Sequence, residues 1–124
     1  MKKSFQCVLS AFSLVVIGMA QTALAQTKPA YLVSELEMKD ANAYANDYSP
    51  KIRAVYAQYG ATFIVGTSQV QSVDQTGAAP QRMVIAKFES MEKAQAYLKS
   101  SERAALIPLR DKIANIKSYL VEGN

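Results

Sequence analysis

Two hydrophobic periodicities alternate along this chain, and their order leaves few folds open. Apolar residues recur at every second position, as is typical of strands, over 30–38, 61–73, 82–88 and 116–122. Spacings of three and four, typical of amphipathic helices, occur between the first two of these segments and between the last two. The resulting order is strand, helix, strand, strand, helix, strand, which is the split βαβ order of ferredoxin-like folds.

This order predicts an α+β domain with a four-stranded antiparallel sheet and both helices on one face, because crossover connections are right-handed. The other face should also be apolar, since Val33 alternates with Leu32 and Tyr119 with Leu120. Contiguous exposed apolar patches of several hundred Å² usually mark an interface. We therefore predict a homodimer in which two copies stack these sheet faces. The alternative is an isolated domain that tolerates the exposed area.

The first helix contains a proline. Asp40 is positioned as its N-cap and Gly60 as its end. Pro50 removes one backbone hydrogen bond and disfavours helical backbone angles at Ser49. We predict two helical segments in tandem, with Ser49 as a second N-cap and Pro50 in the first helical position.

The middle of the chain predicts a hairpin followed by a capped helix. A turn-rich segment, 74–81, separates the second and third strands. Gly66 in the second strand predicts a bulge or bend. Ser90 is positioned to cap the second helix, whose buried side is expected to include Ala94 and Tyr97.

The stretch SSERAALIPLRDK, residues 100–112, is predicted to form two short helical pieces. Ser100 would cap the first piece, and Pro108 would end it. Arg110 would then lie in the first turn of a restarted helix, where free N–H groups and a guanidinium suit a carboxylate, phosphate or enolate. The helix dipole gives no reason for a cation there. Ser100 is also a candidate ligand donor, with the cap as its alternative role.

Several arginines are open to a second interpretation. Arg110 could instead form an ion pair with Asp111, Glu102 or a carboxylate of the partner subunit, which would contribute only about 0–1 kcal/mol if exposed. Arg53 and Arg103 are predicted to lie on the solvated surface.

A tyrosine stripe follows the sheet-facing side of the first helix. Its members are Tyr44, Tyr48, Tyr56 and Tyr59. Each hydroxyl could reach a ligand held between helix and sheet, and Tyr48 is the most attractive because Pro50 disturbs the backbone beside it. The alternative is that these side chains are core aromatics whose hydroxyls reach the rim.

The first 25 residues have the form of a secretory signal peptide. Two lysines precede an apolar core, 7–20, that is shorter than the roughly 20 residues of a membrane span. Small residues at Ala23 and Ala25 fit signal peptidase, so cleavage is expected after Ala25. This predicts one exported domain, 26–124, that is periplasmic or secreted and has no stable membrane span. An uncleaved anchor is the alternative.

The composition of the mature chain excludes several kinds of site. Removing 25 of 124 residues leaves 99, with no cysteine and no histidine. A thiolate nucleophile, an imidazole base and the usual zinc sites are therefore excluded. Loss of Lys2 and Lys3 leaves 12 basic against 10 acidic residues, too little charge to indicate nucleic-acid binding. No metal-ligand spacing or phosphate-binding glycine loop occurs, so no cofactor is expected.

The segments YGATFIV, PQRMVIAKFES, AQAYLKSSERAALIPLR and YLVEG resemble the domain-of-unknown-function 1330 family, within the dimeric α/β barrel superfamily. The resemblance runs from about Tyr31 to Gly123. It implies a ferredoxin-like protomer and a homodimer. Relatives in the wider superfamily include cofactor-independent monooxygenases, haem-handling enzymes, muconolactone isomerases and stress-induced proteins.

The resemblance is uneven at polar positions. Positions that match family residues are Tyr44, Tyr48, Phe88, Ser90, Ser100, Pro108 and Arg110. Tyr97 stands where a tryptophan is common, and Arg103 where a tyrosine is common. Gly66 stands where the family usually has an arginine, and Lys87 where it usually has a glutamate. Any chemistry that needs that arginine and glutamate is therefore not expected here.

Three functions follow from these observations. We favour an exported homodimeric module that binds a small apolar or anionic molecule, because the tyrosines lie beside an arginine and no general base stands out. A cofactor-independent monooxygenase or isomerase would need such a base. The third possibility is a non-catalytic structural dimer. The candidate ligand-binding residues are Arg110, Tyr48, Tyr44, Ser100 and Tyr97.

Overall fold

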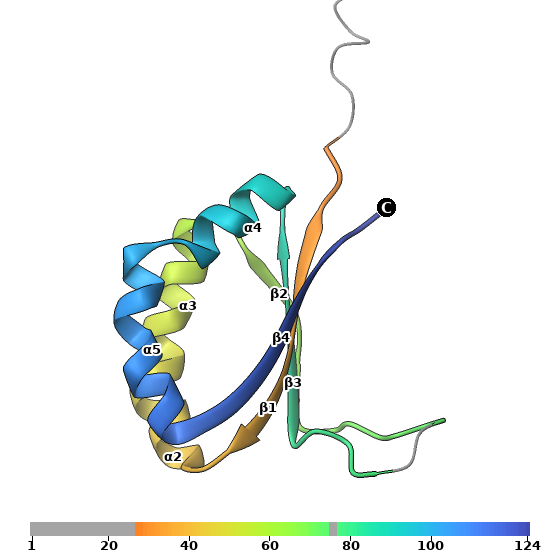
Figure 1. Ribbon diagram of the computed structural model, residues 1–124, viewed down its shortest axis with the longest axis vertical. Helices are drawn as coiled ribbons and strands as arrows, with labels where there is room; N and C mark the ends of the chain where they lie inside the picture. Colours follow the sequence, from red (N-terminus) through yellow and green to blue (C-terminus); the bar gives the residue numbers. More distant parts are fainter. Residues whose placement is uncertain (1–26, 75–76) are drawn as a thin grey trace, which may run out of the picture.

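The computed structural model describes residues 27–74 and 77–124, so the predicted signal peptide lies outside the described residues. Four strands form an antiparallel sheet in the order β2-β3-β1-β4. The strands are β1 (Ala30–Met38), β2 (Thr62–Thr67), β3 (Arg82–Phe88) and β4 (Ala114–Glu122). The helical segments are α2 (Ala41–Ala43), η1 (Tyr44–Tyr48), α3 (Ser49–Gln58), α4 (Met91–Leu98) and α5 (Ser101–Ile113). The helices cover one face of the sheet (Figure 1), which confirms the ferredoxin-like α+β fold.

Strand β1 lies in the middle of the sheet and organises both faces. Leu32 lies opposite Ala86 on β3 and Leu120 on β4, and all three face the helices. Val33, the next residue, faces the other side and lies opposite Ile85. The bounds of β1 and β3 are those that the period-two alternation predicts.

Strand β2 departs from its prediction in length and in the place of its bulge. It ends at Thr67, although the alternation continues to residue 73, because its ladder with β3 ends there. The residue outside the regular pairing is Ile64, and not Gly66, which pairs regularly with Val84. A bulge in an edge strand of this kind re-aims neighbouring side chains.

The first helix runs through its proline, so the prediction of a second N-cap at Ser49 is wrong. Asp40 caps the start as expected, accepting a hydrogen bond from the Ala43 N–H at 3.0 Å. The π-helical turn η1 then leads directly into α3. Ser49 has helical angles, and its N–H donates to the Tyr44 carbonyl. The wider π turn shifts the hydrogen-bond ladder beside Pro50, which accommodates the proline without a break.

Helix α5 is also continuous, and the predicted break at Pro108 is wrong. Ser100 is its N-cap, accepting from the Arg103 N–H at 3.2 Å, and Pro108 lies inside the helix. Arg110 consequently lies in the last turn, where the helix dipole favours a cation. Arg103 is seven residues earlier and shares its face of the helix.

Aromatic rings fill the core between α3, α4 and the sheet. The Tyr56 ring stacks on that of Tyr97, with centroids 4.3 Å apart and planes at 18°. Phe88 on β3 is fully buried 5.5 Å from the Tyr97 ring. Ser90 caps α4 as predicted, accepting from the Lys93 N–H at 3.1 Å.

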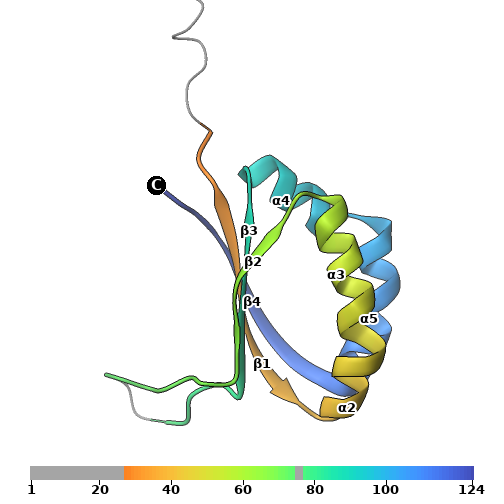
Figure 2. The same ribbon diagram turned by 180° about the vertical axis from the view of Figure 1, so that it is seen from behind.

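The sheet face without helices carries an apolar row across all four strands. The paired residues of this open face are Val65, Ile85, Val33 and Tyr119. Tyr119 is 51% exposed. The described parts of the loop between β2 and β3 project on this same side of the sheet (Figures 1 and 2). Within residues 27–74 and 77–124, no helix is long and apolar enough to cross a membrane.

Replacing Pro108 with alanine should stabilise the protein. The substitution restores an N–H that can donate to the Ala104 carbonyl, and Pro108 is exposed in a turn that is already helical. We expect the free energy of unfolding to rise by about 1–3 kcal/mol, measured by urea denaturation. Pro50→Ala is the control, since the π turn η1 before Pro50 already shifts the hydrogen-bond ladder and accommodates that proline. A loss of stability in Pro108→Ala would contradict a continuous α5.

Candidate functional site

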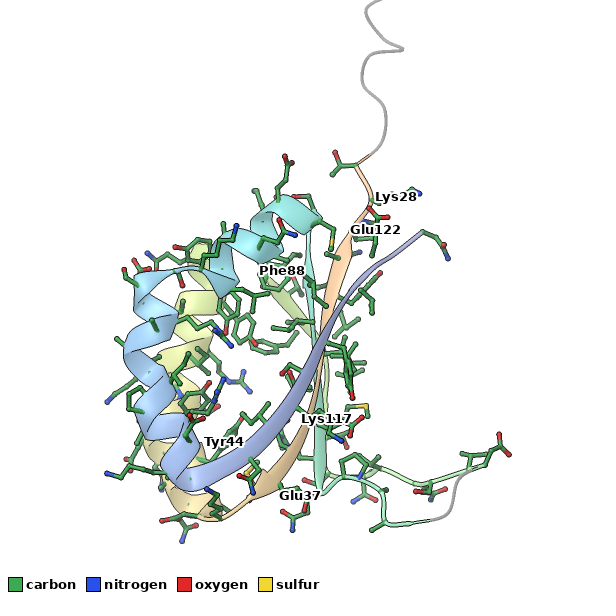
Figure 3. The ribbon with its side chains drawn as sticks, viewed as in Figure 1. Lys28, Glu37, Tyr44, Phe88, Lys117 and Glu122 are labelled. Carbon is green, nitrogen blue, oxygen red and sulfur yellow. The ribbon has the colours of Figure 1, made fainter. Side chains whose placement is uncertain are left out.

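A cavity lies between the helical layer and the sheet. Its volume is about 270 Å³, and its lining comes from η1, α3, α4 and α5 on one side and from all four strands on the other. Figure 3 shows Phe88 towards the α4 end of this interlayer space and Tyr44 towards the α2 end. Sites for drug-sized ligands usually measure about 300–1,000 Å³, so this cavity suits a smaller molecule.

Four of the five candidate residues line this cavity. They are Tyr44, Tyr48, Tyr97 and Arg110. Ser100 is not among the lining residues, and its side chain has another role. Its hydroxyl donates to the Tyr97 carbonyl at 2.7 Å, accepts from the Arg103 N–H, and is buried at the start of α5. The structure therefore places Ser100 as a helix cap, outside the cavity.

Arginines dominate the charge of the lining. Besides Arg110, they are Arg53, Arg82 and Arg103, and no carboxylate belongs to the described lining. Arg53 is exposed as predicted and Arg103 is partly buried, but both also border the cavity, which the prediction of a purely solvated position missed. The spacing of seven between Arg103 and Arg110 is the signal that places them on one helical face once α5 is continuous.

Aromatic rings hold two of these guanidiniums. The Arg53 guanidinium carbon lies 5.1 Å from the Phe63 ring centroid, and its Nε donates to the Ser49 hydroxyl at 3.3 Å. The Arg103 guanidinium carbon lies 5.7 Å from the centroid of the Tyr97 ring. Neither arginine forms a salt bridge with the residues that the structure describes. Cation–π contact thus orients both while leaving donors unused.

Arg110 forms the predicted ion pair with Asp111 and also lines the cavity. Its Nε and Nη2 donate to one oxygen of Asp111 at 3.0 and 2.9 Å. The Arg110 side chain is 20% exposed and lines the cavity, whereas that of Asp111 is 61% exposed. An ion pair with so exposed a carboxylate is weak, about 0–1 kcal/mol, so a ligand anion can compete with it.

The buried tyrosine hydroxyls of the cavity are neutral. Burial raises the pKa of Tyr48 and that of Tyr56 far above the usual 10, and raises the pKa of Tyr97 to about 12. Burial also raises the pKa of Tyr44, although Arg82 and Arg53 act in the opposite direction. These hydroxyls can donate hydrogen bonds to a ligand, but they do not supply a phenolate base near neutral pH.

Comparison with known proteins identifies the family. The model of a domain of unknown function, DUF1330, matches residues 29–124. The chain belongs to this family. The comparison with curated proteins found no match. The family assignment confirms the resemblance that the sequence segments indicate and adds no activity to it.

Solved structures of several proteins are similar to this DUF1330 chain. A protein of unknown function from Rhodopseudomonas palustris has a TM-score of 0.65 at 13% identity, covering 85% of this chain and 90% of its own. SnoaB, a cofactor-independent oxygenase from Streptomyces nogalater, has a TM-score of 0.58 at 12% identity, covering 79% of this chain and 95% of its own. At such identities the likeness shows the shared fold alone.

The raised tyrosine pKa values predict how stability depends on pH. An unfolded tyrosine ionises near pH 10, whereas Tyr48, Tyr56 and Tyr97 hold their protons to higher pH in the folded state. Their stabilising contribution is therefore complete below pH 10 and is lost as the pH rises above it. Absorbance titration of tyrosinate should show four late-ionising tyrosines, because the pKa of Tyr44 is raised as well, and Tyr97→Phe should remove one of them. If all seven tyrosines ionised together near pH 10 in folded protein, the burial argument would fail.

Proposed function

We propose that the mature chain is an exported homodimeric module that binds a small anionic ligand between its helices and its sheet. The observation that carries this proposal is a cavity lined by four arginines with no carboxylate among its described residues. Guanidinium groups form strong, often bidentate hydrogen bonds with carboxylates and phosphates. Partial burial strengthens this attraction relative to water. Export rests on the signal-like first 25 residues.

The composition of the lining favours binding over catalysis. Its described residues include no Asp, Glu or His, and its buried tyrosines are neutral. Removing a proton from a substrate, as oxygenase and isomerase chemistry of this type requires, therefore lacks an evident base. A purely structural dimer is also disfavoured, because it has no need for four repelling cations around one cavity.

The open face supports the dimer. The apolar row of Val65, Ile85, Val33 and Tyr119 crosses the whole sheet and is continued by Val121, which is 45% exposed. A second copy presents the same row, as a two-fold interface requires. The cavity lies on the opposite side of the sheet, so such a dimer leaves each cavity complete.

Loss of one cavity arginine should weaken anion binding. We expect Arg103→Gln to lower the affinity for benzoate, succinate or phosphate, whichever binds most tightly, by about 10–100-fold, because a charged hydrogen bond is lost. Isothermal titration calorimetry on the mature protein measures this. Lys99→Gln removes the same charge from an exposed position outside the cavity and should have no effect. Anion binding is refuted if none of the three probes binds.

Charges placed on the open face should separate the dimer. Tyr119→Glu with Val121→Glu places two carboxylates in the expected interface, and light scattering at micromolar concentration should give the mass of a monomer. Gln58→Glu with Gln95→Glu adds the same charge at exposed positions of the helical layer and should remain dimeric. A wild-type protein that is monomeric under these conditions would rule out the dimer.

A further inference from the structure

The four cavity arginines form two pairs on different walls. The first pair lies against β2, an edge strand. Arg53 is over the Phe63 ring, and Nη2 of Arg82 lies 3.4 Å from the position that a Cβ would take on Gly66. Phe63 and Gly66 are three residues apart on the strand, or at most about 10 Å. Even a Cβ on Gly66 would lie at van der Waals contact distance from Arg82, so Arg82 lies directly against this strand.

The second pair belongs to α5. Arg103 and Arg110 share a helical face and are separated by seven residues, or about 10 Å along the axis. Arg103 is anchored at the end of α4, where its Nη1 approaches the Leu98 carbonyl at 3.4 Å. Helix α5 leads into β4, which is the edge of the sheet opposite to β2. The first pair thus lies against one edge strand, and the helix of the second pair leads into the other edge strand.

Two neighbouring tyrosines of the cavity wall are each affected by a different pair. The rings of Tyr44 and Tyr48 are 5.3 Å apart. Burial has the largest effect on both pKa values, but the arginines that act on them differ. Arg82 and Arg53 lower the pKa of Tyr44, whereas Arg110 and Arg103 lower that of Tyr48. Each tyrosine is therefore associated with one pair, and the aromatic surface joins the two positive regions.

A single carboxylate has two oxygens and accepts bidentate hydrogen bonds from at most two arginines, fewer than the four that line the cavity. A monoanion would therefore leave two of the cavity arginines without a ligand oxygen. Building on the proposed anion binding, we infer that the ligand carries two anionic groups joined by a short apolar or aromatic spacer. One group contacts Arg53 and Arg82, and the other contacts Arg103 and Arg110. The volume of about 270 Å³ limits the ligand to a short aliphatic or single-ring dicarboxylic acid.

The test compares diacids with their monomethyl esters, which remove one charge and add only a methyl group. Isothermal titration of the mature protein with glutarate and terephthalate, each against its monoester, should show one diacid that binds at least about tenfold tighter than its ester. Arg82→Gln should remove most of this difference. Arg53→Gln, at an exposed position of the same pair, repeats the test if Arg82→Gln unfolds.

A second variant tests the α5 pair through an expected gain of affinity, whereas the arginine variants test for a loss. Asp111→Asn releases Arg110 from its ion pair, so the affinity for the diacid should rise by about threefold or more. Glu102→Gln removes an exposed carboxylate from the same helix, outside the cavity, and should change nothing.

The outcomes separate the two proposals. If diacid and monoester bind equally well, or if Arg82→Gln and Arg53→Gln both leave the difference intact, the two-anion inference is overturned while anion binding stands. If no acid or ester binds and phosphate does not bind either, both proposals fail.

Discussion

The stacked rings of Tyr56 and Tyr97 hold the helical layer at a fixed height above the sheet. They join α3 to α4 and rest over Phe88, which is fully buried. Aromatic rings are rigid and large, so this contact sets the distance between the helical layer and the sheet. Smaller side chains elsewhere between the two layers do not fill that distance. The cavity is the part of the interlayer space that remains, and Tyr56 and Tyr97 form part of its wall.

Periodicity predicts the architecture well because each face of the sheet meets one environment along its whole length. The alternation over β1 and β3 therefore gives their bounds without error. The prediction of a strand fails over residues 68–73. The alternating pattern continues there, but β2 no longer pairs with β3. The two prolines were misjudged for another reason. Each proline removes a backbone hydrogen bond, which costs free energy. The π turn before Pro50 compensates for this loss in the first helix, and α5 continues through Pro108 in spite of it.

The candidate site was predictable only in part, and the errors are linked. Helical spacing places Tyr44 and Tyr48 on the inner face without knowledge of the fold. Arg103 was missed because a break at Pro108 removes its relation to Arg110. Arg82 could not be found from its own neighbourhood, since the pairing of β3 with its neighbours determines which face it occupies. Together these side chains form a lining of cations and neutral hydroxyls, in which ligand atoms that accept hydrogen bonds are best satisfied.

Successive residues of each strand belong to opposite surfaces of the sheet, and this limits how the sequence can change. Leu32 lines the cavity and Val33 belongs to the open face, and the same alternation holds between Val84 and Ile85. Single substitutions can therefore alter the cavity lining and the open face separately during evolution. An insertion or deletion of one residue within a strand would exchange the two sets of side chains and damage both at once. Length variation among relatives should accordingly concentrate in the loop between β2 and β3.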